Sequence, residues 1–286
     1  MKIGTVREIW RYPVKSMAGE RVDGCSVGPL GVVGDRGWAL RDEKAGEIRG
    51  AKKLPALMRC AARYVEEPSP ARVPAAEIAF PGGDHVRSDD PAASARLSRL
   101  LGREVTLCPL EPPENLAHYR RALPDNPDML AELREIFGRL EDEPLPDLSV
   151  LPPEIMEFTS PLGTYFDAFP LHLLTTASLA RLASRNPGAR FDVRRFRPNF
   201  LVESDDRRAA LAELDWCGKV LRVGEARIEV KMPTVRCVMT TLEQGDLAKD
   251  PSVLRTIVRE ADQNLGVYAS VVTPGRVVAG DAVELE

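Results

Sequence analysis

Cysteine is scarce in this sequence, and its few cysteines are too widely spaced for a recognisable metal or disulfide motif. The chain has 286 residues and only five cysteines, with no CxxC pair: Cys25, Cys60, Cys108, Cys217 and Cys237. An odd number without close pairs argues against a disulfide framework and against a zinc site of the usual spacing. We therefore expect free, reduced thiols and a cytoplasmic protein.

Histidine, basic charge and long apolar runs are also lacking. His85, His118 and His172 lie far apart and none stands beside a candidate nucleophile, which argues against a histidine-based hydrolase. The formal net charge of -4 lacks the basic excess that nucleic acid requires. No apolar run approaches the roughly 20 residues of a membrane span, and charged residues come too early for a signal peptide. We expect neither a nucleic-acid nor a membrane partner.

Short runs of β-forming residues, separated by glycine and proline, are the commonest pattern that is present. Examples are "GWALRD", "RIEVKM" and "GVYASVV", and "PGGD" at 81–84 and "VGEA" at 223–226 predict hairpin turns. Apolar stripes of helical spacing are fewer and predict core-packed helices near 92–101, 127–140, 176–185 and 251–258. A chain of this length can form two domains. We predict a mainly β protein with helices, of the α+β class, built from two β-barrel-like domains.

The composition changes between residues 109 and 170. Eleven prolines fall in this stretch and interrupt every periodic pattern except the helix near 127–140. Because proline removes a backbone donor and fixes its own φ, regular elements end wherever it occurs. We expect this stretch to be a connector or a lid.

Two N-terminal motifs combine a cation with a hydroxyl or with glycines. "YPVKS" presents Lys15 beside Ser16, and "GPLGVVGDRGW" sets Arg36 among four glycines. Ammonium, guanidinium and hydroxyl groups, with the close backbone approach that glycine permits, suit an anion such as a phosphate. Taken alone, either cation is more typical of a solvated surface loop.

Two further segments carry hydroxyl, guanidinium and amide groups. "TTAS" at 175–178 follows an apolar strand and opens a helix, so Thr175, Thr176 or Ser178 could cap that helix or face a phosphate at its N-terminus. "RRFRPNF" at 194–200 places Arg197 and Asn199 around a proline. These two side chains could bind the edge of a heterocycle or form a structural pair with a carboxylate.

The most unusual cysteine lies in "PTVRCVMTT", where Cys237 directly follows Arg236 at the end of a β-prone stretch. A free cysteine is most often a small buried apolar residue. A neighbouring cation favours the thiolate, which is the form that binds metals or attacks electrophiles. Adjacent side chains of a strand point to opposite faces, so the pairing matters only if the strand ends or bulges there.

Taken together, these motifs resemble the MOSC proteins (molybdenum cofactor sulfurase C-terminal domain). "YPVKS…GDRGW" looks like their N-terminal β-barrel, and "FRPNF…PTVRCVMTT…GVYASVV" looks like the MOSC domain itself. Among MOSC proteins, the chain is most similar to the mitochondrial amidoxime-reducing component and its bacterial relatives. The resemblance covers roughly residues 1–60 and 170–286 and not the proline-rich middle. We expect an N-terminal MOSC β-barrel domain over 1–110, a proline-rich connector or lid with one helix over 111–168, and a MOSC domain over 169–286, for which the resemblance implies a topology like the pyruvate kinase barrel.

The resemblance also implies a cofactor and its ligands. Cys237 would coordinate the metal of a molybdenum cofactor, beside the sulfurs of its molybdopterin, and would be the catalytic residue. The residues that would hold the pterin and its phosphate are Lys15, Ser16, Arg36, Arg197, Asn199 and Arg236, with Thr175, Thr176 and Ser178 as further members.

The implied activity is the reduction of N-hydroxylated or N-oxide-type small molecules by oxygen-atom transfer. The cysteine spacings match no iron–sulfur signature, so electrons would come from a separate partner, a flavin reductase with an iron–sulfur or haem protein. A molybdenum cofactor carrier, or a sulfur-transfer protein with a persulfide on Cys237, is the alternative. A structural module without a cofactor is the third possibility, and the sequence leaves all three open.

Overall fold

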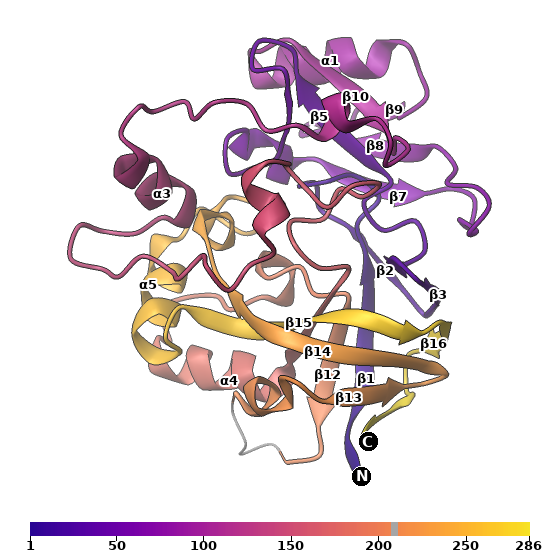
Figure 1. Ribbon diagram of the computed structural model, residues 1–286, viewed down its shortest axis with the longest axis vertical. Coiled ribbons are helices and arrows are strands. Elements are labelled where there is room, and N and C mark those ends of the chain that lie inside the picture. Colours follow the sequence, from indigo (N-terminus) through magenta and orange to yellow (C-terminus); the bar gives the residue numbers. More distant parts are fainter. Residues whose placement is uncertain (207–210) are drawn as a thin grey trace.

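A closed seven-stranded barrel forms one half of the molecule, the lower half in Figure 1. The computed structural model describes residues 1–206 and 211–286. Around the barrel the strands follow the order β1 (Lys2–Arg11), β12 (Phe200–Ser204), β11 (Leu171–Thr175), β15 (Asn264–Thr273), β14 (Ala226–Val235), β13 (Val220–Val223) and β17 (Ala282–Leu285). The pairing of β17 with β1 closes the ring, and β2 (Glu20–Val22) extends β1. The expectation of a mainly β fold with helices is confirmed.

The barrel is filled by the side chains that alternate strands direct inward. Along β14 buried residues alternate with half-buried ones from Ala226 to Val230, as expected where one face of a strand is covered. Ile228, Val230, Phe200 and Val267 pack with other apolar residues into one cluster. Each such side chain contributes roughly 1.5–3 kcal/mol when fully buried, which makes this cluster the rigid base on which the neighbouring loops rest.

Three small sheets account for the remaining β structure of the described residues. Their strands are β5 (Trp38–Asp42), β6 (Glu47–Arg49) and β10 (Val105–Pro109); β7 (Ala61–Tyr64), β8 (Ala76–Ala79) and β9 (His85–Arg87); and β3 (Gly24–Gly28), β4 (Gly31–Val32) and β16 (Gly275–Val278). The predicted turns join β8 to β9 and β13 to β14, and Gly82, Gly83 and Gly224 all have positive φ. The first two sheets enclose a second apolar core with Leu40, Leu57 and Leu97.

In the described ranges 1–206 and 211–286, five α-helices and five short 3-10 helices cover the strands or lie in connections. They are α1 (Ala92–Leu101), α2 (Leu116–Tyr119), α3 (Met129–Phe137), α4 (Thr176–Arg185) and α5 (Pro251–Glu260), with η1 (Pro55–Arg59), η2 (Pro153–Met156), η3 (Val193–Arg195), η4 (Ala212–Trp216) and η5 (Val238–Thr241). The four predicted helices are therefore present. In the part of the chain that the structure describes, no helix has the length and apolar character needed to cross a bilayer.

The prediction that all four apolar stripes pack against a core is, however, wrong for α3. Asp128 caps this helix through Leu130 N and Ala131 N, but Met129 remains 51% exposed and Leu130 54% exposed. Only Phe137, at its end, is buried among its apolar residues. The helix lies on the proline-rich segment that crosses outside both cores (Figure 1), so its stripe faces a cavity and solvent instead.

Two strands pair across the expected domain boundaries. β1 lies between β12 and β17, and β16 pairs with β3. The division into 1–110, 111–168 and 169–286 therefore remains a proposal, because strands of the first range pair with strands of the last. This sharing fixes the N-terminal loops after β1 against the loops of the barrel.

Candidate functional site

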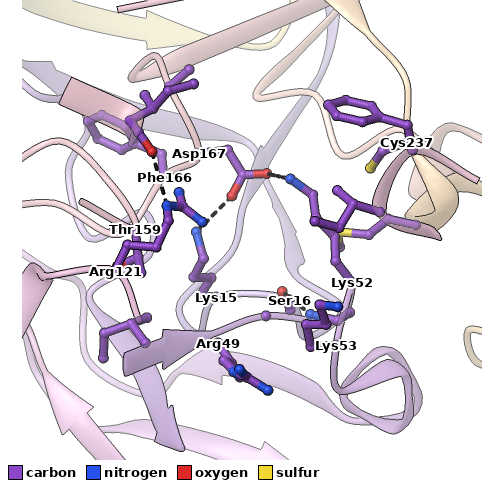
Figure 2. Close-up of a pocket in the computed structure, with 18 of the residues that line it drawn as sticks. Lys15, Ser16, Arg49, Lys52, Lys53, Arg121, Thr159, Phe166, Asp167 and Cys237 are labelled. Carbon is purple, nitrogen blue, oxygen red and sulfur yellow. Dashed lines mark hydrogen bonds and ion pairs between the residues drawn. The ribbon is translucent and has the colours of Figure 1, made fainter. Parts of the chain in front are cut away.

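A cavity of about 790 Å³ lies where the N-terminal sheets, the proline-rich segment and the barrel meet. Figure 2 shows Lys15, Lys52 and Asp167 grouped within it, with Cys237 to the right of this group, on the side of Lys52. The structure brings seven of the ten predicted site residues to its lining: Lys15, Ser16, Arg36, Arg197, Asn199, Arg236 and Cys237. These residues lie as far apart in sequence as Lys15 and Cys237, so the fold brings the separate motifs together in one site.

Three of these residues have a backbone conformation that is rare outside glycine. The φ angles are 68° at Ser16, 52° at Arg36 and 56° at Arg197. Each such residue costs on the order of 1–3 kcal/mol and persists only where its surroundings enforce it. Here the Arg36 amide donates to the Tyr12 carbonyl at 2.7 Å, and the Ser16 hydroxyl accepts from the Ala51 amide at 2.9 Å. The strained loops hold side chains in the cavity.

A buried tyrosine is placed between two of the cations. The Tyr12 ring lies 5.0 Å from the Arg36 guanidinium and 4.2 Å from that of Arg197, and its hydroxyl donates to the Pro198 carbonyl. Burial, then repulsion from Arg36, lowers the pKa of Arg197 to about 10, which leaves it charged at neutral pH. Cation–π attraction to the one ring therefore helps to hold both guanidinium groups in place.

Asn199 is largely occupied by protein partners. Its amide donates to Asp35 Oδ2 at 3.0 Å, and its carbonyl oxygen accepts from the His172 amide at 3.1 Å. Asp35 in turn pairs with Arg36. Asn199 therefore has the structural role foreseen for the "RRFRPNF" segment. It positions the Asp35 carboxylate, and this carboxylate orients Arg36.

Lys15 and Lys52 share one carboxylate. Lys15 Nζ lies 2.8 Å from Asp167 Oδ1, and Lys52 Nζ lies 3.1 Å from Asp167 Oδ2. Burial alone would raise the pKa of Asp167, but the two ammonium groups hold it well below its usual range. Burial lowers the pKa of Lys15, and Asp167 opposes that shift. A single aspartate thus keeps two lysines side by side at the cavity (Figure 2).

Cys237 lies just beyond the end of β14. The strand ends at Val235, Arg236 donates its amide to the Gln263 carbonyl at 2.9 Å, and Cys237 opens η5. Because the strand ends there, the side chains of Arg236 and Cys237 both line the cavity instead of pointing to opposite faces. Next to them, burial and then the charge of Arg236 hold the pKa of His172 well below its usual range, so this imidazole is neutral.

Arg139, which the motifs did not indicate, holds the backbone before Cys237. This buried guanidinium donates to the Arg236 carbonyl at 2.9 Å, to Gln263 Oε1 at 3.0 Å and to the Phe137 carbonyl at 2.6 Å. Gly138 has a φ of 62° and approaches Val238 so closely that a Cβ there would lie 3.2 Å from the valine Cβ. The end of α3 is therefore packed against both flanks of Cys237.

Thr175, Thr176 and Ser178 are the three predicted residues that the structure places elsewhere. Thr175 caps α4, and the hydroxyls of Thr175 and Ser178 donate to the buried Glu213 Oε2 at 2.9 and 2.7 Å. None of the three is among the residues that line the cavity. The expectation that they contact a phosphate is corrected: α4 begins beside the buried Glu213, and these three residues lie outside the cavity lining.

The sequence also failed to indicate several cavity residues. Ten cationic and five acidic side chains line the cavity, and the cations missed are Arg49, Lys52, Lys53, Arg120, Arg121 and Arg195. The "RGAKK" stretch at 49–53 is a local signal that could have been used, whereas Arg120 and Arg121 follow no motif. The excess of positive charge favours an anionic ligand. We call Lys15, Arg36, Lys52, Arg197 and Arg236 the cationic floor.

The opposite wall of the cavity comes from the proline-rich segment and is apolar. We call Met129, Leu133, Ile136, Leu151, Ile155 and Met156 the connector wall. Arg121 holds this wall in place, because it donates to the carbonyls of Ile155 and Phe158 at 3.0 Å each. The cavity therefore has a charged side and an apolar side.

Within residues 1–206 and 211–286, the buried atoms Arg197 Nη2, Arg236 Nε and His172 Nε2 have no hydrogen-bond partner. Leaving a buried polar group unpaired costs roughly 1–3 kcal/mol, so such groups at a cavity indicate a ligand that pairs with them. A soft sulfur donor stands beside them in Cys237. This set of donors fits an anionic, nitrogen- and oxygen-rich ligand that carries a soft metal.

Comparison with known proteins agrees with this geometry. Family models match residues 163–284 ("MOSC domain") and 3–94 ("MOSC N-terminal beta barrel domain"). The "Mitochondrial amidoxime reducing component 2" of Bos taurus and the "Mitochondrial amidoxime-reducing component 1" of Homo sapiens are 24% and 23% identical, each over 99% of this chain and 83% of the relative. The "Molybdenum cofactor sulfurase 3" of Aedes aegypti is 37% identical over 29% of this chain and 11% of its own. The chain therefore belongs to the MOSC-domain proteins, in the group that also carries the MOSC N-terminal beta barrel domain.

Proposed function

We propose that this protein binds a molybdenum cofactor in the cavity and reduces N-hydroxylated or N-oxide-type small molecules, with Cys237 as the ligand of the metal. The observation that carries the proposal is the position of Cys237 beside a cationic floor that contains unpaired buried donors. The names of the amidoxime-reducing relatives support the reaction class, and family membership supports the cofactor.

The cationic floor would hold the anionic part of the cofactor. Lys15, Arg36, Arg197 and Arg236 would donate charge-assisted hydrogen bonds to its phosphate and pterin, and Ser16 would keep the loop at Ala51 in place. Because Tyr12 and Asp167 already fix the positions of these cations, little ordering is needed when the anion binds.

The protein contributes a soft ligand and groups of defined protonation. When bound, the cofactor supplies a metal that accepts the substrate oxygen, which two electrons and two protons later release as water. The Cys237 thiolate is the ligand type that a metal already held by sulfur prefers. Burial raises the pKa of Tyr268, so this cavity residue keeps its phenolic proton, while His172 stays neutral. Tyr268 and His172 are therefore both uncharged at neutral pH.

Electrons would reach the site from a separate partner, a flavin reductase together with an iron–sulfur or haem protein. None of the cysteine spacings in the sequence follows an iron–sulfur signature. The protein should therefore be inert with reduced nicotinamide alone and active when such a donor system is added.

A second function, cofactor carriage or sulfur transfer through Cys237, is favoured by one observation. A stretch that covers 29% of the chain is 37% identical to a protein named as a molybdenum cofactor sulfurase. A carrier needs the cationic floor and a holding ligand, but it needs neither an electron donor nor a substrate subsite.

Elemental analysis and one turnover assay test the proposal. Protein made in a host that synthesises the cofactor should contain molybdenum in equimolar amount. A strong one-electron chemical reductant then bypasses the choice of partner, and an amidoxime and an N-oxide are offered as substrates. Multiple turnovers per molybdenum are expected. Zero turnover, together with transfer of intact cofactor to an apo-molybdoenzyme, would overturn the reductase and establish the carrier.

A further inference from the structure

The connector wall exposes apolar side chains to the same cavity that contains Cys237. Met129 of α3 is 51% exposed and Met156 at the end of η2 is 69% exposed, and both line the cavity. Large apolar groups that remain exposed in a concave site indicate a surface that a ligand covers. A purely polar ligand would leave this wall uncovered.

The wall is a built feature rather than a loose loop. At one end of α3, Lys53 Nζ lies 2.7 Å from Glu132 Oε1, and at the other Arg139 and Arg255 bind the helix C-terminus and the Gly138 carbonyl. Arg121 holds the carbonyl of Ile155. The two segments that carry Met129 and Met156 are therefore fixed before any ligand arrives.

The apolar character of α3 divides between the cavity and solvent. Leu130 and Leu140 are 54% and 56% exposed, but neither lines the cavity, whereas Met129, Leu133 and Ile136 do. Continuity with the Cys237 cavity distinguishes the second group from an ordinary exposed patch. A volume of about 790 Å³ lies within the range of pockets that enclose small molecules.

We propose that the connector wall is the subsite for the apolar body of the substrate, so that the protein acts on amphiphilic molecules whose reducible N–O group is carried on an alkyl or aryl body. The inference rests on the proposed function and adds the substrate class. The polar N–O group lies toward Cys237, and the body lies between α3 and η2. Methionines at two of the contact positions accommodate bodies of different shape, since their side chains are unbranched and flexible.

A homologous series of alkyl amidoximes tests this subsite in the loaded protein. In the parent, kcat/KM should rise about threefold for each added methylene until the wall is covered, the effect of burying one CH2 group. The double variant Met129→Gln/Met156→Gln should flatten this dependence. The matched control is Leu130→Gln/Leu140→Gln, which places the same amides on α3 and its following loop but outside the cavity, and which should retain the parental slope.

A second measurement needs neither cofactor nor turnover. Nile red, a neutral apolar dye, is titrated onto cofactor-free protein, and its fluorescence reports binding to an apolar surface. The cavity variant should bind it at least fivefold more weakly than the parent and the control, the loss expected for one or two buried methylenes. If no amidoxime is reduced by any protein but the dye result is as expected, the proposed function fails and the apolar subsite stands. A flat chain-length series in an active parent, or equal loss of dye binding in both double variants, would overturn the subsite.

Discussion

The cationic floor and the connector wall face the same cavity but are built in opposite ways. The floor residues are mostly buried, two of them have positive φ, and their partners are an aromatic ring and a carboxylate. The wall consists of exposed and half-buried apolar side chains on a proline-rich segment that carries the nine-residue helix α3. A strained floor with fixed cations and two unpaired buried donors suits one particular anion, whereas an apolar wall suits ligands that differ in shape. Under the proposed function, the floor would bind the cofactor and the wall would select the substrate.

Replacing the metal ligand should have the largest effect. Cys237→Ser exchanges a soft thiolate for a hard hydroxyl, so turnover with a chemical reductant should fall to the background rate while the protein remains folded. The control is Cys217→Ser, a half-buried cysteine that does not line the cavity. Turnover of the Cys237 variant at the parental rate, measured by loss of an amidoxime, would remove Cys237 from the chemistry.

Changing the floor should affect the cofactor and not the choice of substrate. Arg197→Gln removes a cation with an unpaired buried nitrogen, and loss of charge-assisted hydrogen bonds of roughly 1.5–3 kcal/mol predicts about ten- to hundredfold weaker retention. The measurement is molybdenum per protein after extensive dialysis. Met129→Gln on the wall is the control and should keep the parental content. Equal losses in both variants would contradict the division between floor and wall.

The floor was largely predictable from sequence because its residues stand in short motifs. Lys15, Arg36, Arg197 and Arg236 each lie within a run whose glycine or proline marks a fixed loop, and the family resemblance joins these runs. Lys52 was missed although it lies in the basic "RGAKK" stretch, and Asp167 was missed because an aspartate in an unmarked stretch looks like an ordinary surface residue. Their pairing across 115 residues exists only in three dimensions.

The wall was not predictable, for a physical reason. The stripe on α3 has the same periodicity whether it packs on a core or borders a cavity, because periodicity records which side is apolar and not what covers it. The helix itself, with its Asp128 cap and Gly138 stop, was correctly placed. Arg139 carried no signal, since its three acceptors include the distant Arg236 carbonyl and Gln263 side chain. The pairing of β1 with β12 and β17 is equally non-local.

Arg139 links the two regions, and its removal should have an intermediate effect. Arg139→Met leaves the Arg236 carbonyl without its donor, so amides of residues 236–242 should exchange hydrogen about tenfold faster in cofactor-free protein. Arg134→Met is the matched control, because Arg134 binds the carbonyls of Leu140 and Glu143 and does not contact the Cys237 turn. Hydrogen exchange followed by mass spectrometry separates the two. Equal acceleration in both variants would show a general loosening of the segment instead of a specific hold on Cys237.

The smallest effect is expected where the proline-rich segment meets the floor, at Asp167. Its side chain is about half exposed, so its pairing with Lys15 and Lys52 should stabilise the empty protein by about 1 kcal/mol, or roughly 2–4 °C in Tm. Asp167→Asn should lose that amount near pH 7, measured by urea unfolding of cofactor-free protein.

The pH dependence gives the sign of this contribution. The folded pKa of Asp167 lies well below the usual value because Lys15 and Lys52 outweigh burial, so the stabilisation is present above the unfolded pKa of about 3.9. It is lost as the pH falls through the folded pKa, and the parent and the variant should converge there. A difference that persists unchanged at the lowest pH at which both proteins fold would mean that Asp167 acts through packing. In that case the contact between the proline-rich segment and the cationic floor would depend on packing and not on charge. A bound anion would then leave this contact unaltered.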